Sequence, residues 1–178
     1  MKSHGCGKAK VLTPEEFREI KSKVHYKYQV FFDIMMETGA RVSEICKLRF
    51  VDIVNNTLVL RKNNTKTKET REIAISPTLF NKISKLPQVN GYVFPGMNGN
   101  GHITRYMIDK VLRNACKECG IDGVSSHSFR RTTITELSRN NVSLRVIQKI
   151  SGHKNLDVLQ GYVDVSDEEV MCALQTRW

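Results

Sequence analysis

The sequence of 178 residues lacks the features that would place it in a membrane, a secretory pathway or a repeat array. Its apolar runs fall well short of the ~20 residues that a membrane-spanning helix requires. No signal peptide, internal repeat or low-complexity tract is visible. We therefore expect one soluble intracellular domain.

Residues that hold metal ions in recognisable patterns are scarce as well. The five cysteines are an odd number, and Cys116 and Cys119 form a C-x-x-C pair with no second pair at zinc-ligand spacing. His4 and Cys6 do not complete a site, and the acidic residues form no obvious metal cage. We therefore expect neither a metal ion nor a cofactor.

Charge of one sign is in clear excess. Lys and Arg number 28 against 18 acidic residues, which gives a net charge of +10 and a pI of about 9.5. This balance favours a polyanionic partner such as nucleic acid, although many basic proteins bind none. The excess is concentrated in residues 41–71, whereas residues 157–169 are acidic. One face is therefore expected to meet phosphates and the tail to meet protein.

Hydrophobic periodicity and capping residues predict an α+β fold that is mainly α-helical. Thr13 and Glu16 form a capping box around Pro14, where the first helix should begin. Asn55-Asn56 suits a turn between two strands. Further helices are expected over residues 26–38, 42–48, 76–86, 104–119, 126–140 and 144–150, and from residue 166. Residues 51–53, 57–60 and 71–75 are expected to form a small three-stranded antiparallel sheet.

Four side chains in the C-terminal third suit phosphate chemistry. His127 and Arg130 lie three residues apart on an expected helix, so they share a face. We expect both, with Arg131, to face outward. Arg130 can grip two phosphate oxygens, His153 is a donor near neutral pH, and the hydroxyl of Tyr162 can act as a covalent nucleophile.

These residues stand in two segments that resemble the signature boxes of the tyrosine recombinases, the phage integrase family. Residues 127–162 contain His-Ser-Phe-Arg-Arg, then Gly-His, then a tyrosine nine residues after the second histidine. Residues 38–45 read Thr-Gly-Ala-Arg-Val-Ser-Glu-Ile. The two boxes occur in the family's order and about a domain apart, and the resemblance covers roughly residues 12–165. It implies the tyrosine recombinase catalytic-domain fold.

The resemblance also implies a mechanism. Tyr162 would attack a DNA phosphate and form a 3′-phosphotyrosine link, without metal or ATP. Arg41 and Arg130 would stabilise the transition state, and His127 and His153 would hydrogen-bond the phosphate. Considered alone, Arg41 is better explained as a solvated surface residue or as the partner of Glu44, and only the second box favours a catalytic role.

A lysine completes the set that the resemblance implies. The family pattern places a general acid about five residues before the arginine that opens the next strand, which points to Lys66. Lys62 and Lys68 remain alternatives, because hairpin length varies. Lys62, Lys68, Arg71 and Arg131 are also expected to contact DNA.

The expected organisation is a basic lead-in over residues 1–11, the catalytic domain over 12–165 and a C-terminal helix or tail over 166–178 that docks on a neighbouring protomer. We do not expect residues 1–10 to form the helical core-binding domain of most family members, so the chain resembles either an excised catalytic domain or a short stand-alone form. The resemblance implies that the partner is double-stranded DNA and that the protein is a monomer when free and a homo-tetramer on DNA. It also implies a cytoplasmic or nucleoid-associated protein, encoded by a cell, a virus or a plasmid. A type IB topoisomerase and a non-catalytic DNA-binding protein of the same fold are the alternatives.

Overall fold

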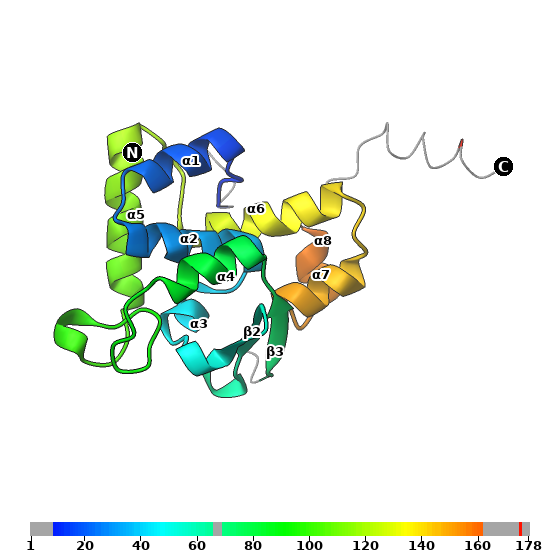
Figure 1. Ribbon diagram of the computed structural model, residues 1–178. Coiled ribbons are helices and arrows are strands. Elements are labelled where there is room, and N and C mark those ends of the chain that lie inside the picture. The colour runs from blue at the N-terminus through cyan, green and yellow to red at the C-terminus, as the bar shows by residue number, and fades with distance from the viewer. Residues whose placement is uncertain (1–8, 66–68, 162–174, 176–178) are drawn as a thin grey trace.

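The computed structural model describes residues 9–65, 69–161 and Gln175, and shows helices packed against a small sheet that lies at one edge of the molecule (Figure 1). The expected fold class is confirmed. Within the described residues, no helix combines the length and apolar character needed to cross a membrane.

The first helix begins, and the second helix ends, where the capping residues predict. Helix α1 spans Pro14–Ser22, and Thr13 forms the expected capping box with Glu16. Helix α2 spans Tyr26–Thr38 and ends at Gly39, whose left-handed conformation (φ 60°) closes the last turn.

The sheet follows the short helix α3 (Val42–Cys46). Strands β1 (Ile53–Val54), β2 (Thr57–Leu60) and β3 (Arg71–Ala74) are antiparallel in the order β1-β2-β3. The expected strand at 51–53 is wrong for most of its length, because η1 (Phe50–Asp52) is a 3₁₀ turn that the Asp52 carboxylate caps at the Arg49 N–H. A second turn, η2 (Lys62–Asn64), precedes the undescribed tip of the β2–β3 hairpin.

The remaining helices pack on the first two helices, on one another and, through α7, on strand β3. They are α4 (Pro77–Ser84), α5 (Arg105–Cys119), α6 (Ser126–Arg139), α7 (Leu144–Ser151) and α8 (Leu156–Gln160), with a 3₁₀ turn η3 (Met97–Gly99) before α5. Each of the first four lies within a few residues of its expected range. The helix expected from Ser166 falls almost entirely outside the described residues.

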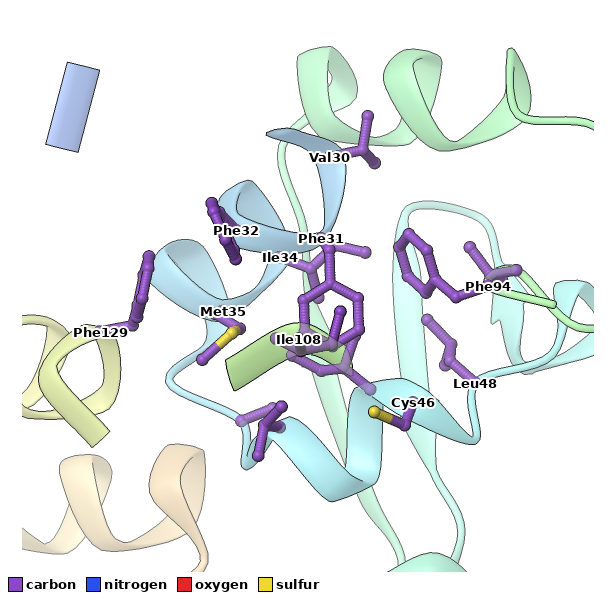
Figure 2. Close-up of a cluster of buried hydrophobic side chains, with 14 of the residues drawn as sticks. Val30, Phe31, Phe32, Ile34, Met35, Cys46, Leu48, Phe94, Ile108 and Phe129 are labelled. Carbon is purple, nitrogen blue, oxygen red and sulfur yellow. The ribbon is translucent and has the colours of Figure 1, made fainter. Parts of the chain in front are cut away.

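The main hydrophobic core is built around α2. Phe31 and Phe94 meet edge to face with ring centroids 4.7 Å apart, and Phe32 lies 5.2 Å from Phe129 of α6 (Figure 2). All four rings are fully buried. Because α6 packs directly on α2 through Phe129, the core fixes the helix that carries His127 and Arg130.

A second and smaller apolar cluster holds the C-terminal helices. Its buried members are Ile134 of α6, Ile147 of α7 and Leu159 of α8. These side chains form a group separate from the main core. The segment that carries His153 is therefore anchored mainly on the second half of α6.

Candidate active site

Arg41 is held at the start of α3 by a buried carboxylate. Its backbone N–H donates to Glu44 Oε2 at 2.9 Å, and its Nη1 donates to Oε1 at 3.0 Å. The Glu44 side chain is wholly buried, whereas that of Arg41 remains 24% exposed. Arg41 can therefore pair with Glu44 and also belong to the site, because the ion pair fixes one side of the guanidinium and leaves the other side exposed.

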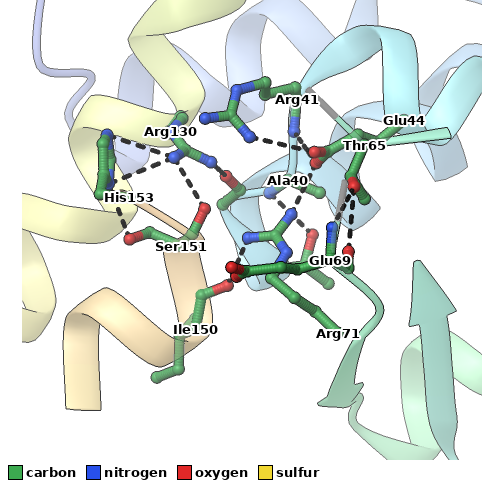
Figure 3. Close-up of polar contacts among 12 residues, drawn as sticks. Ala40, Arg41, Glu44, Thr65, Glu69, Arg71, Arg130, Ile150, Ser151 and His153 are labelled. Carbon is green, nitrogen blue, oxygen red and sulfur yellow. Dashed lines mark hydrogen bonds and ion pairs between the residues drawn. The ribbon is translucent and has the colours of Figure 1, made fainter. Parts of the chain in front are cut away.

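Arg130 is buried, so the expectation that it faces outward is wrong. Its Nη1 donates to the carbonyl of Gly39 at 2.8 Å, and its Nη2 donates to the carbonyl of Ser151 at 2.7 Å (Figure 3). These carbonyls lie at the C-terminal ends of α2 and α7, where helix dipoles place partial negative charge. Two helix ends thus orient one guanidinium.

His153 lies against this guanidinium. Arg130 Nη2 is 3.2 Å from each of its ring nitrogens, and the Ser151 hydroxyl lies 2.8 Å from Nδ1. Burial, followed by the positive charges of Arg130, Arg41 and Arg71, lowers the pKa of His153 to about 4. At neutral pH the imidazole is therefore uncharged, so it can form a hydrogen bond but carries no positive charge of its own.

Arg71 connects strand β3 both to Glu44, which holds Arg41, and to the end of α7, which precedes His153. Its guanidinium donates to Glu44 Oε2 at 2.7 Å and to the carbonyl of Ile150 at 3.0 Å (Figure 3). Burial is the main cause that lowers its pKa, partly offset by the charge of Glu44. We expected Arg71 to contact DNA, but the alternation of β3 turns it inward and leaves it only 8% exposed.

The turn after α7 depends on this arginine. Gly152 adopts φ +66°, and a Cβ added there would lie 2.4 Å from Arg71 Nη1 and 2.7 Å from Cζ. Glycine at this position therefore serves two needs: the left-handed backbone that presents His153, and the space that the guanidinium occupies.

The open side of the site is a hollow of about 200 Å³, which we call the catalytic hollow. Its charged and polar wall comprises Arg41, Ser43, Arg105, Ser126, His127 and Arg130. His127 is exposed there, at the start of α6. The structure thus brings together Arg41, His127, Arg130 and His153 from segments far apart in the sequence, in a positive environment suited to an anionic group.

The structure describes only some of the remaining candidate residues. Lys66, Lys68 and Tyr162 lie outside the described residues. Lys62 is exposed at the base of the hairpin. Arg131 is half-buried and donates to the carbonyl of Ala9 at 2.7 Å, so it also holds the N-terminal segment rather than simply facing outward.

Sequence reasoning missed three contributors. Arg105 and Ser126 line the catalytic hollow, and Ser151 positions His153 through its hydroxyl. None lies at one of the motif positions used to choose the candidates, and only the folded chain brings them to the site. Among residues 9–65, 69–161 and 175, no group of three or more His, Cys, Asp or Glu side chains is placed to hold a metal ion.

Comparison with known proteins gives a family for nearly the whole chain. A model described as the phage integrase family matches residues 10–169. The chain is 27% identical to the tyrosine recombinase XerC of Corynebacterium efficiens over 176 residues, covering 95% of this chain and 54% of that protein. It is 28% identical to a tyrosine recombinase of Thermosipho africanus, covering 80% and 51%. The chain thus spans about half the length of these curated relatives.

Solved structures show the same fold. The integrase of the transposon Tn1549, in complex with a circular intermediate DNA, superposes with a TM-score of 0.82 at 18% identity over 98% of this chain and 68% of that one. The catalytic domain of bacteriophage HP1 integrase gives 0.73 at 20% identity, with 96% of each chain covered.

Proposed function

Because the chain belongs to the phage integrase family, we propose that it is a tyrosine recombinase that cuts and rejoins DNA at a specific site. The observation that carries the proposal is the convergence of Arg41, His127 and Arg130 on the catalytic hollow, with His153 against the Arg130 guanidinium. Two guanidinium groups and two imidazoles at one site can bind a phosphodiester through its non-bridging oxygens.

The proposed reaction is a transesterification. The hydroxyl oxygen of Tyr162 forms a bond to phosphorus and passes its proton to His127, which acts as the base. The bond from phosphorus to the 5′ oxygen of the next nucleotide breaks, and Lys66 protonates that oxygen. A 3′-phosphotyrosine link remains, and attack by a 5′ hydroxyl reverses the step with no input of energy.

Arg41 and Arg130 would stabilise the pentacoordinate transition state, which carries more negative charge on its equatorial oxygens than the ground state. Both guanidinium groups are held before substrate binds, one by Glu44 and the other by two helix-end carbonyls. Such preorganised charge lowers a barrier because it needs no reorientation during the reaction. The neutral imidazole of His153 would add a hydrogen bond to the phosphate.

The proposal extends to the assembly. Residues 12–165 would form the catalytic domain, and the segment 166–178 would dock on a neighbouring protomer within a tetramer on two DNA sites. Relatives of about twice this length are named as recombinases. Solved structures of the same fold hold DNA, among them the XerH recombinase on its difH substrate. These names support double-stranded DNA as the partner.

The test is covalent trapping on DNA. Nicked duplexes of random sequence lose a short fragment on cleavage, so the reverse reaction cannot occur and a protein–DNA adduct accumulates. Adducts that survive denaturation in EDTA are sequenced to find the site. We expect an adduct from the wild-type chain and none from Tyr162→Phe, which removes only the nucleophilic oxygen. If the wild-type chain binds the random-sequence duplexes yet yields no adduct from any of them, the proposal is contradicted.

A further inference from the structure

A second hollow, larger than the catalytic hollow, lies where α3, the sheet and the segment before α5 meet. Its volume is about 500 Å³. We call it the basic hollow, and its principal lining residues are Lys47, Arg49, Arg61, Asn63, Tyr92 and His102. None of these six residues was a sequence candidate for the site.

The basic hollow carries net positive charge. Its carboxylate, Asp52, is 2% exposed, is paired with Arg61 and accepts the backbone N–H of Arg49. Among the ion pairs of the described residues, none involves Lys47 or the Arg49 side chain. The acidic group is thus covered while the basic groups face the opening.

Aromatic rings hold the arginine in place. The Arg49 guanidinium lies 4.8 Å from the centre of the Tyr92 ring, and the His102 ring meets Tyr92 edge to face at 5.6 Å. The backbones of Arg49 and Tyr92 also pair through an isolated antiparallel bridge. Stacking of this kind restricts a long side chain, so less entropy is lost when the guanidinium binds an anion.

Two separate segments of the chain each contribute residues to both hollows. On α3 and its C-cap, Ser43 lines the catalytic hollow and Lys47, one helical turn or about 6 Å further on, lines the basic hollow. Where the chain enters α5, His102 lines the basic hollow and Arg105, the first residue of α5, lines the catalytic hollow. Figure 1 shows the segment before α5 next to α3. A ligand seated at the catalytic hollow can therefore continue into the basic hollow.

The chemistry and the spacing fit a sugar-phosphate backbone. Lys, Arg, Asn and Tyr side chains are the usual donors to DNA phosphates. Successive phosphates of one strand rise by about 3.4 Å along the helix axis, so the ~6 Å from Ser43 to Lys47 is of the order of the spacing between neighbouring phosphates. We propose that the basic hollow binds the backbone of duplex DNA next to the cleaved phosphate. This inference rests on the proposed function and extends it to a second contact site on the same DNA.

The test measures how DNA affinity depends on salt. The variant Lys47→Gln/Arg49→Gln removes two charges and keeps hydrogen-bonding side chains. Its matched control is Lys23→Gln/Lys117→Gln, which removes two exposed charges near the far end of α5, about 20 Å along that helix. Affinity for a fluorescein-labelled random duplex of roughly 40 base pairs is followed by anisotropy at several salt concentrations.

Each lost phosphate contact lowers the slope of log affinity against log salt by about 0.9. We expect the Lys47/Arg49 variant to lose about 1–2 units of slope and to bind about 10-fold or more weakly at 0.1 M salt. The control should match the wild type. A slope equal to that of the wild type and the control overturns the proposal.

A third variant guards against misfolding. Asn63→Asp places a negative charge at an exposed position in the basic hollow and removes no packed group. It should weaken binding while its thermal melt matches the wild type, and wild-type affinity would count against the hollow. The adduct assay separates the two proposals. An adduct without a slope change refutes the basic hollow alone, whereas a slope change without any adduct refutes the recombinase activity alone.

Discussion

Replacing Gly152 by alanine tests the tie between the histidine turn and Arg71. The added Cβ would lie 2.4–2.8 Å from three atoms of the Arg71 side chain. A flexible side chain normally moves aside from such a clash. Arg71 has little freedom to do so, because its side chain is 7% exposed and its guanidinium is bound to Glu44 and to the Ile150 carbonyl.

The structure supplies a control with the same backbone strain. Gly120 ends α5 with φ +66°, the value found at Gly152, but a Cβ there meets nothing within 4 Å. Gly120→Ala should therefore show the left-handed penalty alone, about 1–2 kcal/mol. Gly152→Ala should add the cost of disrupting a buried ion pair, about 3 kcal/mol because Glu44 keeps Arg41. The total expected for Gly152→Ala is then about 4–5 kcal/mol.

Urea unfolding followed by circular dichroism measures both variants. A loss of 4–5 kcal/mol is a large share of the 5–15 kcal/mol typical of a domain, so the midpoint should move far more for Gly152→Ala than for Gly120→Ala. If the two variants lose the same free energy of unfolding, within about 0.5 kcal/mol, the reasoning is refuted, because Arg71 would then have an alternative low-energy conformation.

Three further predictions concern single side chains. The pKa of His153, about 4 in the folded chain against 6.5 for the free group, means that only the unfolded chain takes up this proton between these values. Stability should therefore fall as the pH falls from 6.5 to 4, and urea unfolding at pH 7 and 5 should show a smaller fall in His153→Gln. Arg130→Lys cannot bond both helix-end carbonyls, so adduct formation should slow about 10²-fold in single-turnover trapping, a loss similar to that of one oxyanion donor. Thr13→Ala removes the α1 capping box and should lower the free energy of unfolding by about 1 kcal/mol, with adduct formation unchanged.

The sequence predicted helix boundaries well where capping residues and apolar spacing mark them. The bounds of α2 follow from its apolar spacing and from the glycine after it, and the capping box fixed the start of α1. The strand expected at 51–53 failed because a side chain, Asp52, captured the backbone N–H of Arg49 and tightened the chain into a 3₁₀ turn. Alternation alone cannot reveal that competition.

The site was predictable as a set of residues but not as an arrangement. Arg130 was expected to face solvent because a charged helical residue usually does, yet its partners are carbonyls 91 and 21 residues away in the sequence. Arg71 was misjudged for the same reason, since its partner Glu44 lies 27 residues earlier. Such contacts arise only when helix ends and strands meet in the folded chain.

The small cluster of Ile134, Ile147 and Leu159 gives the C-terminal helices a stability of their own. Helices that bury few apolar side chains open at free energies below that of global unfolding. Release of α7 and α8 as one cooperative unit would carry His153 away from Arg130 while the core around α2 stays folded. In native-state hydrogen exchange, the amides of α7 should therefore exchange through a lower-energy opening than those of α2. The catalytic arrangement would then come apart, and re-form, without the domain unfolding.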